Sequence, residues 1–291
     1  MRLSSVIVSA VILGLAQPAW AADEAKHAVK SGSHFGVEVV KDVPYYAGAD
    51  ADAVKHKLDL YLPKGHKDFP VLFFVHGGAW RSGLAKDYAF PAEMFVAAGA
   101  HYVVPDFAWV QDAGGSLAPI SDQIRRALAW VARNAASFGG DASRIYVSGH
   151  SSGGHQAAVL ATTDWKRDFG LPPEVVKGYV LISGIYELYP VSLSARASYV
   201  KFDERTLAEL SAMRHLERIG APVALVYGTL ETPEFQRQSR EFAQALRKAG
   251  MPVQLIVADG YNHFEVMETL GHPFEFAGRA ALEQMKLKTP A

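Results

Sequence analysis

Residues 144–154 read Arg-Ile-Tyr-Val-Ser-Gly-His-Ser-Ser-Gly-Gly, and they constrain the fold more than any other stretch of the chain. A short β-branched and aromatic run is followed at once by a Gly-x-Ser-x-Gly pentapeptide and then by residues that favour a helix. We expect a turn so tight that a Cβ at Gly149 or Gly153 would collide with the neighbouring strand or helix. Ser151 should then lie at the tip in a strained conformation. A Gly/Ser-rich turn without chemical consequence has the same pattern, so the rest of the chain must decide.

The composition is that of a chain that can bury a large core. Of its 291 residues, 49% are hydrophobic and 20% are charged, which fits one α/β domain of ordinary size. The formal net charge of -1 provides no basic surface for nucleic acid, and a small, roughly neutral substrate fits such a chain best. The absence of cysteine excludes disulfides, thiolate metal sites and a cysteine nucleophile.

Residues 1–21 have the pattern of a secretory signal peptide. A positive charge near the start precedes residues 6–15, which are almost entirely apolar, and residues 17–21 end in a small-x-small cleavage pattern. The apolar run is shorter than the roughly 20 residues that a membrane span needs. We therefore expect cleavage after Ala21, which leaves a single domain of residues 22–291.

A retained anchor helix is the weaker alternative, because Asp23, Glu24 and Lys26 follow the cleavage pattern directly. Without a cysteine there can also be no lipid attachment at the cut. We expect the mature protein in the periplasm or outside the cell, without a stable membrane anchor.

Apolar segments of strand length alternate along the chain with segments of helical pattern. Strands are expected at residues 37–43, 57–62, 71–75, 102–104, 145–147, 179–182, 223–227 and 253–257. Helices are expected at residues 88–98, 120–136, 234–249 and 274–285, and from residue 152 onward. The first two strands should form an antiparallel edge pair in a mostly parallel sheet of about eight strands flanked by helices. Residues 187–219 break the alternation, and we expect this insertion to form a small lid over the site.

A serine nucleophile needs donors that stabilise the oxyanion forming on its substrate. In open parallel sheets such groups gather at the carboxyl ends of the strands. Residues 76–80 follow the buried strand at 71–75 and read His-Gly-Gly-Ala-Trp, where glycines let bare amides approach a substrate oxygen. We assign the N–H groups of Gly77, Gly78 and Ser152 as an oxyanion hole, although a glycine turn after a strand is common by itself.

The base that activates the serine should lie in a loop after the last strand, where His263 follows residues 253–257. His150 and His155 flank Ser151 on the wrong side of the turn, and we expect them to support packing. No pair of histidines has the spacing of metal ligands on one helix, so no metal is expected.

The third member must orient the imidazole and should lie between the serine and the histidine in the chain. Glu231 occupies the loop after the strand at 223–227. Glu234 is one alternative, but it falls in a first helical turn, where a carboxylate has another explanation because it interacts favourably with the helix dipole. Asp259 is another, but its Asp-Gly pair is typical of a turn. We favour Glu231 over both.

These segments resemble the α/β-hydrolase superfamily, in its esterase and lipase branch, and within that branch the kynurenine formamidases (arylformamidases). The resemblance is carried by residues 76–81, 149–155, 183–188, 233–239 and 262–264, which together span roughly residues 40 to 285. It implies the α/β-hydrolase fold and places the catalytic acid two positions before Pro233, at Glu231. The family more often has aspartate there, a change that lengthens the side chain and keeps its role.

We expect a serine carboxylesterase that cleaves small-acyl esters through a Ser-His-Glu triad and an acyl-enzyme intermediate, with no cofactor. An arylformamidase acting on N-formylkynurenine-type aryl formamides is the alternative. The expected signal peptide disfavours it, because kynurenine formamidases act on a cytosolic metabolite and secreted relatives are usually carboxylesterases. A non-catalytic binding protein with this fold is the alternative from another class.

The pocket around the reacting groups is expected to involve aromatic side chains. Trp80, beside the oxyanion glycines, should restrict the acyl pocket to small groups. Trp109, Tyr186 and Phe264 are candidate walls on the alcohol or aryl side, with ordinary core packing as the alternative for each.

Overall fold

The computed structural model describes residues 37–48, 55–65 and 67–290, all of which belong to one compact unit, Ser31–Ala291. The expected signal peptide at residues 1–21 lies outside the described residues. No helix in the described ranges combines the length and the apolar character that a membrane span requires.

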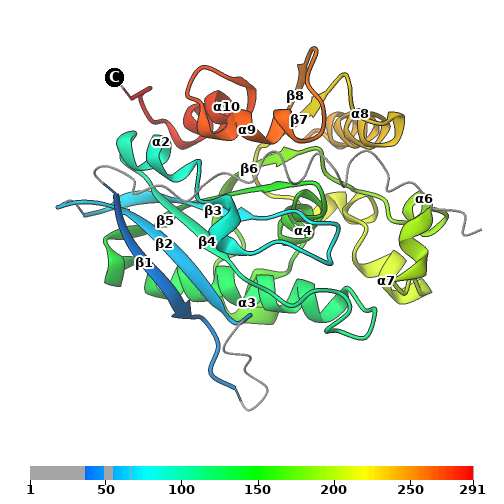
Figure 1. Ribbon diagram of the computed structural model, residues 1–291, viewed down its shortest axis with the longest axis horizontal. Coiled ribbons are helices and arrows are strands. Elements are labelled where there is room, and N and C mark those ends of the chain that lie inside the picture. The colour runs from blue at the N-terminus through cyan, green and yellow to red at the C-terminus, as the bar shows by residue number, and fades with distance from the viewer. Residues whose placement is uncertain (1–36, 49–54, 66, 291) are drawn as a thin grey trace, which may run out of the picture. The chain divides into compact units, whose positions relative to one another are not determined.

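A single eight-stranded sheet forms the centre of this unit, with the strand order β1-β2-β4-β3-β5-β6-β7-β8 (Figure 1). The strands are β1 (Val37–Pro44), β2 (Lys57–Pro63), β3 (Phe69–Val75), β4 (His101–Pro105), β5 (Gly140–His150), β6 (Val176–Ile182), β7 (Val223–Gly228) and β8 (Val253–Ala258). β2 pairs antiparallel with both β1 and β4, and the remaining pairs are parallel. The expected edge pair and the mostly parallel sheet are confirmed.

Helices connect most of the strands. The α-helices are α2 (Ala92–Ala97), α3 (Ala118–Asn134), α4 (Ser152–Ala161), α5 (Trp165–Phe169), α6 (Tyr189–Ser192), α7 (Glu204–Glu209), α8 (Pro233–Lys248), α9 (Glu265–Glu268) and α10 (Phe276–Met285). Short 3-10 helices occur at η1 (Ala85–Tyr88), η2 (Ala135–Phe138), η3 (Ala195–Ser198), η4 (Ala212–Arg214), η5 (Leu216–Arg218) and η6 (Thr269–Gly271).

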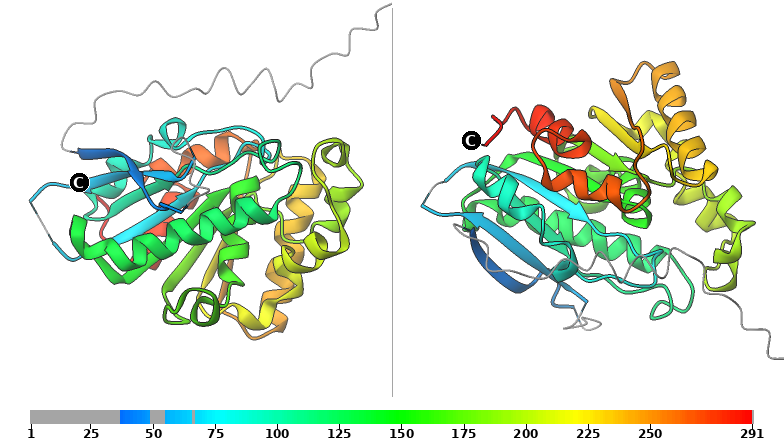
Figure 2. Two further views of the ribbon diagram at one scale, coloured as in Figure 1. Left: turned by 90° about the horizontal axis from the view of Figure 1, so that it is seen from below. Right: turned by 45° about the horizontal axis from the view of Figure 1, so that its top comes forward.

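The helices cover both faces of the sheet, so its central strands are buried on both sides. Successive side chains of a strand point to opposite faces. Accordingly, Phe73 of β3 packs in one apolar cluster with α3, α4 and α8, while Phe74 packs in another with α2, α9 and α10. Figures 1 and 2 show α3 along one face, with α2 and α10 along the other. This two-sided burial explains the uninterrupted apolar run of β3.

One expected helix is wrong in its extent. Residues 88–98 were expected to form a single helix, but the structure has η1 at Ala85–Tyr88 and a separate α2 at Ala92–Ala97. Pro91 explains the break, because it has no N–H to donate and disfavours helical geometry at the residue before it.

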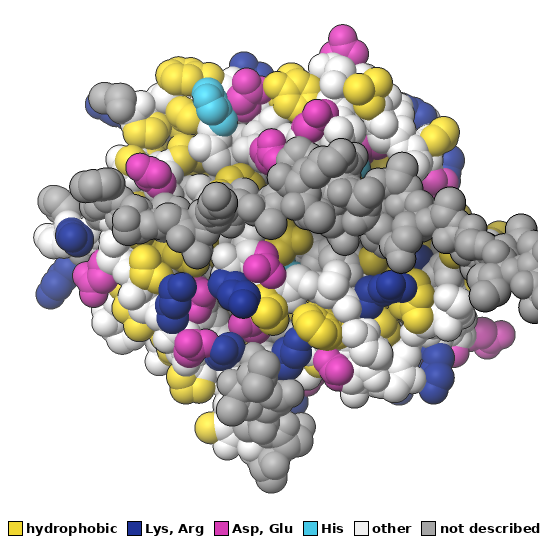
Figure 3. Space-filling view, in the orientation of Figure 1, with side chains coloured by type: hydrophobic (Ala, Val, Ile, Leu, Met, Phe, Trp, Pro, Cys, Tyr) yellow, Lys and Arg dark blue, Asp and Glu magenta, His cyan; other side chains and the backbone are white. Residues whose placement is uncertain are grey.

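The loops that leave the carboxyl ends of β3, β5, β7 and β8 meet at one edge of the sheet. Thr229 N–H donates to the carbonyl of Ala258 at 3.1 Å, and Leu230 N–H donates to the carbonyl of Tyr261 at 3.0 Å, so the loops after β7 and β8 are joined. Elsewhere on the unit, Lys and Arg side chains are interspersed with Asp and Glu on the face drawn in Figure 3. The common edge of the four loops is where the chemically reactive residues lie.

Candidate active site

Ser151 lies at the sharp turn between β5 and α4, in a conformation that non-glycine residues rarely adopt. Its φ and ψ are 57° and −120°, and its N–H donates to the carbonyl of Ile182 at 2.9 Å. A Cβ at Gly149 would approach the carbonyl oxygen of Gly153 to 2.4 Å, and one at Gly153 would approach the carbonyl oxygen of Val75 to 2.1 Å. The expected steric role of both glycines is confirmed, because only a residue without a Cβ fits either position.

His263 connects Ser151 to Glu231. Its Nε2 lies 2.9 Å from the Ser151 hydroxyl oxygen, and its Nδ1 lies 2.6 Å from Oε1 of Glu231. A carboxylate oxygen accepts hydrogen bonds, so Nδ1 carries the proton and donates it. Nε2 is then free to accept from the serine hydroxyl. Ser151, His263 and Glu231, which come from three separate loops, are therefore joined by two consecutive hydrogen bonds.

The buried carboxylate of Glu231 is held by its own loop. The side chain is 0% exposed, and its Oε2 accepts from the backbone N–H of Gly228 at 3.2 Å. The two alternative acids lie elsewhere. Glu234 pairs with Arg237 at 2.6 Å, and Asp259 accepts from the hydroxyl of Thr229 at 3.0 Å. Of the three acids considered, the structure brings Glu231 to His263.

The glycine loop after β3 lies directly against the serine turn. A Cβ at Gly77 would be 3.4 Å from Cβ of Ser151, which places the Gly77 backbone beside the reacting side chain. In the part of the chain that the structure describes, the N–H groups of Gly77 and Gly78 donate no hydrogen bond. Ser152 begins α4, so its N–H has no partner within that helix. The three amides assigned to an oxyanion hole are therefore available to a substrate oxygen.

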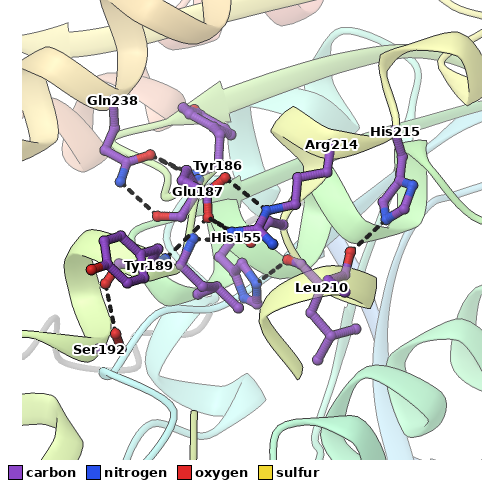
Figure 4. Close-up of polar contacts among 12 residues, drawn as sticks. His155, Tyr186, Glu187, Tyr189, Ser192, Leu210, Arg214, His215 and Gln238 are labelled. Carbon is purple, nitrogen blue, oxygen red and sulfur yellow. Dashed lines mark hydrogen bonds and ion pairs between the residues drawn. The ribbon is translucent and has the colours of Figure 1, made fainter. Parts of the chain in front are cut away.

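Trp80 connects the glycine loop to α4 through two hydrogen bonds. Its backbone N–H donates to the Ser152 hydroxyl at 3.2 Å, and its indole N–H donates to Nδ1 of His155 at 3.2 Å. His155 Nε2 in turn donates to the carbonyl of Leu210 at 2.8 Å, within the insertion (Figure 4). Burial lowers the pKa of His155 to about 4, which keeps the ring in the neutral form that this chain of bonds requires.

His150 was expected to support packing, but it also hydrogen-bonds to the loop that carries His263. Its Nε2 donates to the backbone carbonyl of His263 at 2.8 Å, and the two rings lie 4.6 Å apart. Burial, together with the nearby His263, lowers the pKa of His150 well below its usual range. A neutral His150 therefore holds the loop that carries His263. This contact joins two loops far apart in the chain, so no local pattern indicated it.

Two phenylalanines contact the imidazole of His263. The ring of Phe235, at the start of α8, lies 4.3 Å from it, centroid to centroid, and the ring of Phe264 lies edge-on at 5.5 Å. Both phenylalanines and His263 are partly exposed. Phe264 was a candidate pocket wall, whereas Phe235 was not, although it belongs to a segment that carries the family resemblance.

The other candidate pocket residues differ in exposure. Trp80 is 2% exposed, and Tyr186 is fully buried and stacks on Phe242 at 4.3 Å. Tyr186 therefore packs in the core, which was the alternative given for it. Trp109 is partly exposed, and its indole N–H donates to the carbonyl of Gly83 at 3.0 Å.

The described residues contain no group of three histidine or acidic side chains that could hold a metal ion. What the site contains is a hydroxyl with a base, a carboxylate behind the base, and amides beside the hydroxyl. Such groups can transfer an acyl group from an ester or amide to the serine oxygen and then to water.

The chain is similar to several known proteins. A family model described as BD-FAE matches residues 58–187, a range that includes Gly77 and Ser151. Kynurenine formamidase of Danio rerio is 31% identical over 258 residues, which cover 84% of this chain and 82% of that protein. The chain belongs to the α/β-hydrolase esterases of the BD-FAE family.

Other α/β-hydrolase esterases are similar over most of their length. Carboxylesterase NlhH of Mycobacterium tuberculosis is 28% identical over 256 residues, which cover 77% of each chain. The crystal structure of esterase B from Lactobacillus rhamnosis superposes with a TM-score of 0.75 at 18% identity, covering 92% of this chain and 91% of that one. The expected α/β-hydrolase fold and the resemblance to kynurenine formamidase are confirmed, and the protein is a hydrolase of the esterase class.

Proposed function

We propose that the protein is a serine carboxylesterase that cleaves small-acyl esters, with Ser151 as nucleophile, His263 as general base and acid, and Glu231 as the residue that orients His263. The observation that carries the proposal is the pair of short contacts on the two nitrogens of His263, 2.9 Å to Ser151 and 2.6 Å to Glu231. Both contacts have the length of good hydrogen bonds.

In the first half-reaction, His263 Nε2 takes the proton of the Ser151 hydroxyl while the serine oxygen forms a bond to the substrate carbonyl carbon. The negative charge that develops on the carbonyl oxygen is stabilised by the amides of Gly77, Gly78 and Ser152. Glu231 stabilises the imidazolium through Nδ1. His263 then gives its proton to the leaving oxygen, the ester bond breaks, and an acyl-serine remains.

In the second half-reaction, water replaces the leaving group. His263 Nε2 removes a proton from the water, whose oxygen bonds to the acyl carbon, and the same amides stabilise the second oxyanion. The proton then returns to the serine oxygen as its bond to the acyl group breaks. The products are a carboxylic acid and the starting enzyme.

The size of the acyl group is the next part of the proposal. Trp80 is almost fully buried, and two hydrogen bonds hold it against α4 beside the glycine loop. A large fixed side chain next to the oxyanion amides leaves room for formyl, acetyl and similar groups. The test compares p-nitrophenyl esters of increasing chain length, and faster turnover of palmitate than of acetate would contradict this part.

A second candidate is an arylformamidase that hydrolyses the formamide bond of N-formylkynurenine-type substrates. It is favoured by the 31% identity to kynurenine formamidase of Danio rerio over most of both chains. The same three side chains would act, with an arylamine as the leaving group. Comparing kcat/KM for N-formylkynurenine with that for simple aryl acetates separates the two candidates.

The experiment that tests the proposed chemistry is a pre-steady-state assay with p-nitrophenyl acetate. An acyl-serine intermediate gives a burst of p-nitrophenol close to one equivalent when deacylation is slower than acylation. Labelling by a phosphonate ester, which traps the nucleophile, should modify Ser151 alone. If wild-type protein shows neither turnover nor labelling, or if Ser151→Ala retains either, a non-catalytic binding protein becomes the better explanation.

We also propose that the protein is exported, with residues 1–21 removed. The support is the sequence pattern of a charged start, an apolar run and a small-x-small end. N-terminal sequencing of the protein recovered from a periplasmic or secreted fraction should begin at Ala22. A full-length chain found only in the cytoplasm would contradict export.

A further inference from the structure

Two arginines at the edge of the site carry charges that the described chain does not neutralise. Arg81 directly follows Trp80 in the glycine loop, and Arg196 lies in η3 of the insertion. Arg81 lies over the ring of Tyr199, with its guanidinium carbon 4.9 Å from the ring centroid. Burial raises the pKa of the Tyr199 hydroxyl, and the charges of Arg196 and Arg81 and a hydrogen bond from the Arg196 side chain act against this rise, so both guanidinium groups lie near that hydroxyl.

Neither arginine forms an ion pair with a described residue. Glu187 and Glu234, two acidic side chains on nearby elements, are already paired with other arginines at 2.7 and 2.6 Å. Arg196 Nε is also buried, without a hydrogen-bond partner in the part of the chain that is described. The side chain of Arg196 also hydrogen-bonds to Tyr199, so Nε is the donor that still lacks an acceptor. A buried donor on a charged group is costly to leave unpaired, and a ligand that supplies an acceptor at Nε would remove this cost.

Arg196 is one residue away from the reacting groups, and Arg81 shares Tyr199 with it as a neighbour. The guanidinium carbon of Arg196 is 5.9 Å from the ring centroid of Phe235, and that ring lies 4.3 Å from the imidazole of His263. In the proposed mechanism His263 protonates the leaving group. The departing alcohol, phenol or arylamine therefore leaves on the side of the site where Phe235 and Arg196 lie.

The insertion that carries Arg196 is fastened at its base, as Figure 4 shows. Arg214 donates two hydrogen bonds to Glu187, at 2.9 and 2.7 Å, and Gln238 of α8 accepts from the Glu187 N–H at 2.9 Å. Farther along, Lys201 N–H donates to the carbonyl of Gly115 at 2.8 Å. Contacts on both sides of η3 thus hold in place the segment that carries Arg196.

We propose that Arg196 and Arg81 bind a carboxylate on the leaving-group portion of the substrate, with Phe235 as an apolar surface for its aromatic or aliphatic part. The natural substrates are then esters or amides whose alcohol, phenol or arylamine carries a negative charge. This inference rests on the proposed function and narrows its substrate class, replacing the roughly neutral substrate expected from composition. The planar guanidinium suits a carboxylate, because it can donate two parallel hydrogen bonds to it.

The test compares para-acetoxybenzoate with para-acetoxybenzamide, two aryl acetates of similar shape that differ in the charge of the leaving group. Wild-type protein should give the higher kcat/KM for the carboxylate. In Arg196→Gln, kcat/KM for para-acetoxybenzoate should fall by about 10-fold to 100-fold, mainly through KM, with the amide nearly unchanged. Arg81→Gln should change the same ratio in the same direction.

Arg205→Gln is the matched control, because it removes one positive charge from the same insertion at a side chain that is 82% exposed and paired with Glu209. It should leave the substrate ratio unchanged. An equal loss on both substrates in Arg196→Gln and Arg81→Gln, or no change in the ratio, would overturn the inference. So would a ratio that changes only for esters with the carboxylate on the acyl side, such as phenyl hydrogen succinate against phenyl butyrate.

Binding separates this inference from the proposed function. Titration of Ser151→Ala with para-hydroxybenzoate and para-hydroxybenzamide, followed by calorimetry, needs no turnover. Tighter binding of the carboxylate that disappears in Ser151→Ala/Arg196→Gln supports the arginine site even if no ester is hydrolysed. Serine-dependent hydrolysis of neutral esters, without preference for the carboxylate in binding or turnover, leaves the proposed function standing and rejects the arginine site.

Discussion

His150 Nε2 donates a hydrogen bond to the backbone carbonyl of His263 at 2.8 Å, so the residue before Ser151 holds the residue that faces Ser151. His150 is the last residue of β5 and His263 lies in the loop after β8, and these two strands are separated by β6 and β7 in the sheet. This bond supplements the side-chain contact between Ser151 and His263 with a second link between the same loops. The position of the imidazole relative to the serine oxygen therefore depends on His150.

Replacing His150 by phenylalanine keeps an aromatic ring of similar size and removes the donor. We expect kcat to fall by about 10-fold or more, because losing a hydrogen bond to a partly buried carbonyl costs about 1 to 3 kcal/mol and loosens the base. KM should change little, since His150 is buried behind the reacting groups. Steady-state kinetics with p-nitrophenyl acetate checks this split, and a wild-type kcat in a folded His150→Phe protein would show that the bond has no positioning role.

The three reacting side chains should differ in how much activity their loss removes. Ser151→Ala and His263→Ala should each lower kcat by on the order of 10⁶, because the nucleophile and base act as a unit. Glu231→Ala should lower it by about 10⁴, since the carboxylate orients and stabilises the imidazole without taking its proton. Measuring kcat for all three variants under one set of conditions establishes the order.

The choice of acid has its own control in Asp259, which bonds to Thr229. Asp259→Ala should keep kcat within a few-fold of wild type, because its carboxylate does not contact His263. If Asp259→Ala lost most of its kcat while Glu231→Ala kept a kcat near that of wild type, the assignment of Glu231 would be wrong.

Gly153→Ala should destabilise the fold. The added Cβ would lie 2.1 Å from the carbonyl oxygen of Val75 and 2.4 Å from that of His76, and backbone atoms in a sheet cannot move aside cheaply. We expect a loss of at least about 3 kcal/mol in the free energy of unfolding. Gly220→Ala is the matched control, because nothing lies within 4 Å of its Cβ position. Urea unfolding of both variants gives the comparison, and equal stabilities would contradict the packing argument.

Stability should fall with acid partly because of His155. Burial, aided by the charge of Arg125 and opposed by the bond to Leu210, lowers the pKa of folded His155 to about 4 from 6.5. Between these values the unfolded chain binds a proton that the folded chain does not. The contribution of neutral His155 to the free energy of unfolding is therefore fully present above pH 6.5. It decreases by about 1.4 kcal/mol per pH unit as the pH falls toward 4.

The variant His155→Gln removes this titration while leaving an amide that can bond to both Trp80 and Leu210. Its free energy of unfolding should be lower than wild type at pH 7, and it should depend less steeply on pH between 6.5 and 4. Denaturant unfolding at several pH values measures both slopes. Parallel slopes for the two proteins would mean that His155 is not neutral in the folded state.

The sheet could be predicted from the sequence because its causes are local. The apolar run of β3, buried on both faces, and the polar-apolar alternation of β2 are visible in a few consecutive residues. The steric demand for Gly149 and Gly153 is equally local. The helix expected at residues 88–98 was wrong in extent because Pro91 interrupts the helical pattern that surrounds it.

The sequence alone determined the strands, the order of the four site-bearing loops and a short set of candidate acids and bases. Only the tertiary structure decided which candidates meet: Glu231 rather than Glu234 or Asp259, His150 against the His263 carbonyl, and Phe235 against the imidazole. The physical reason is the distance along the chain over which each effect acts. Backbone sterics and apolar periodicity act over a few residues, whereas a hydrogen bond of 2.6 to 2.9 Å between separate loops depends on the register of every strand between them.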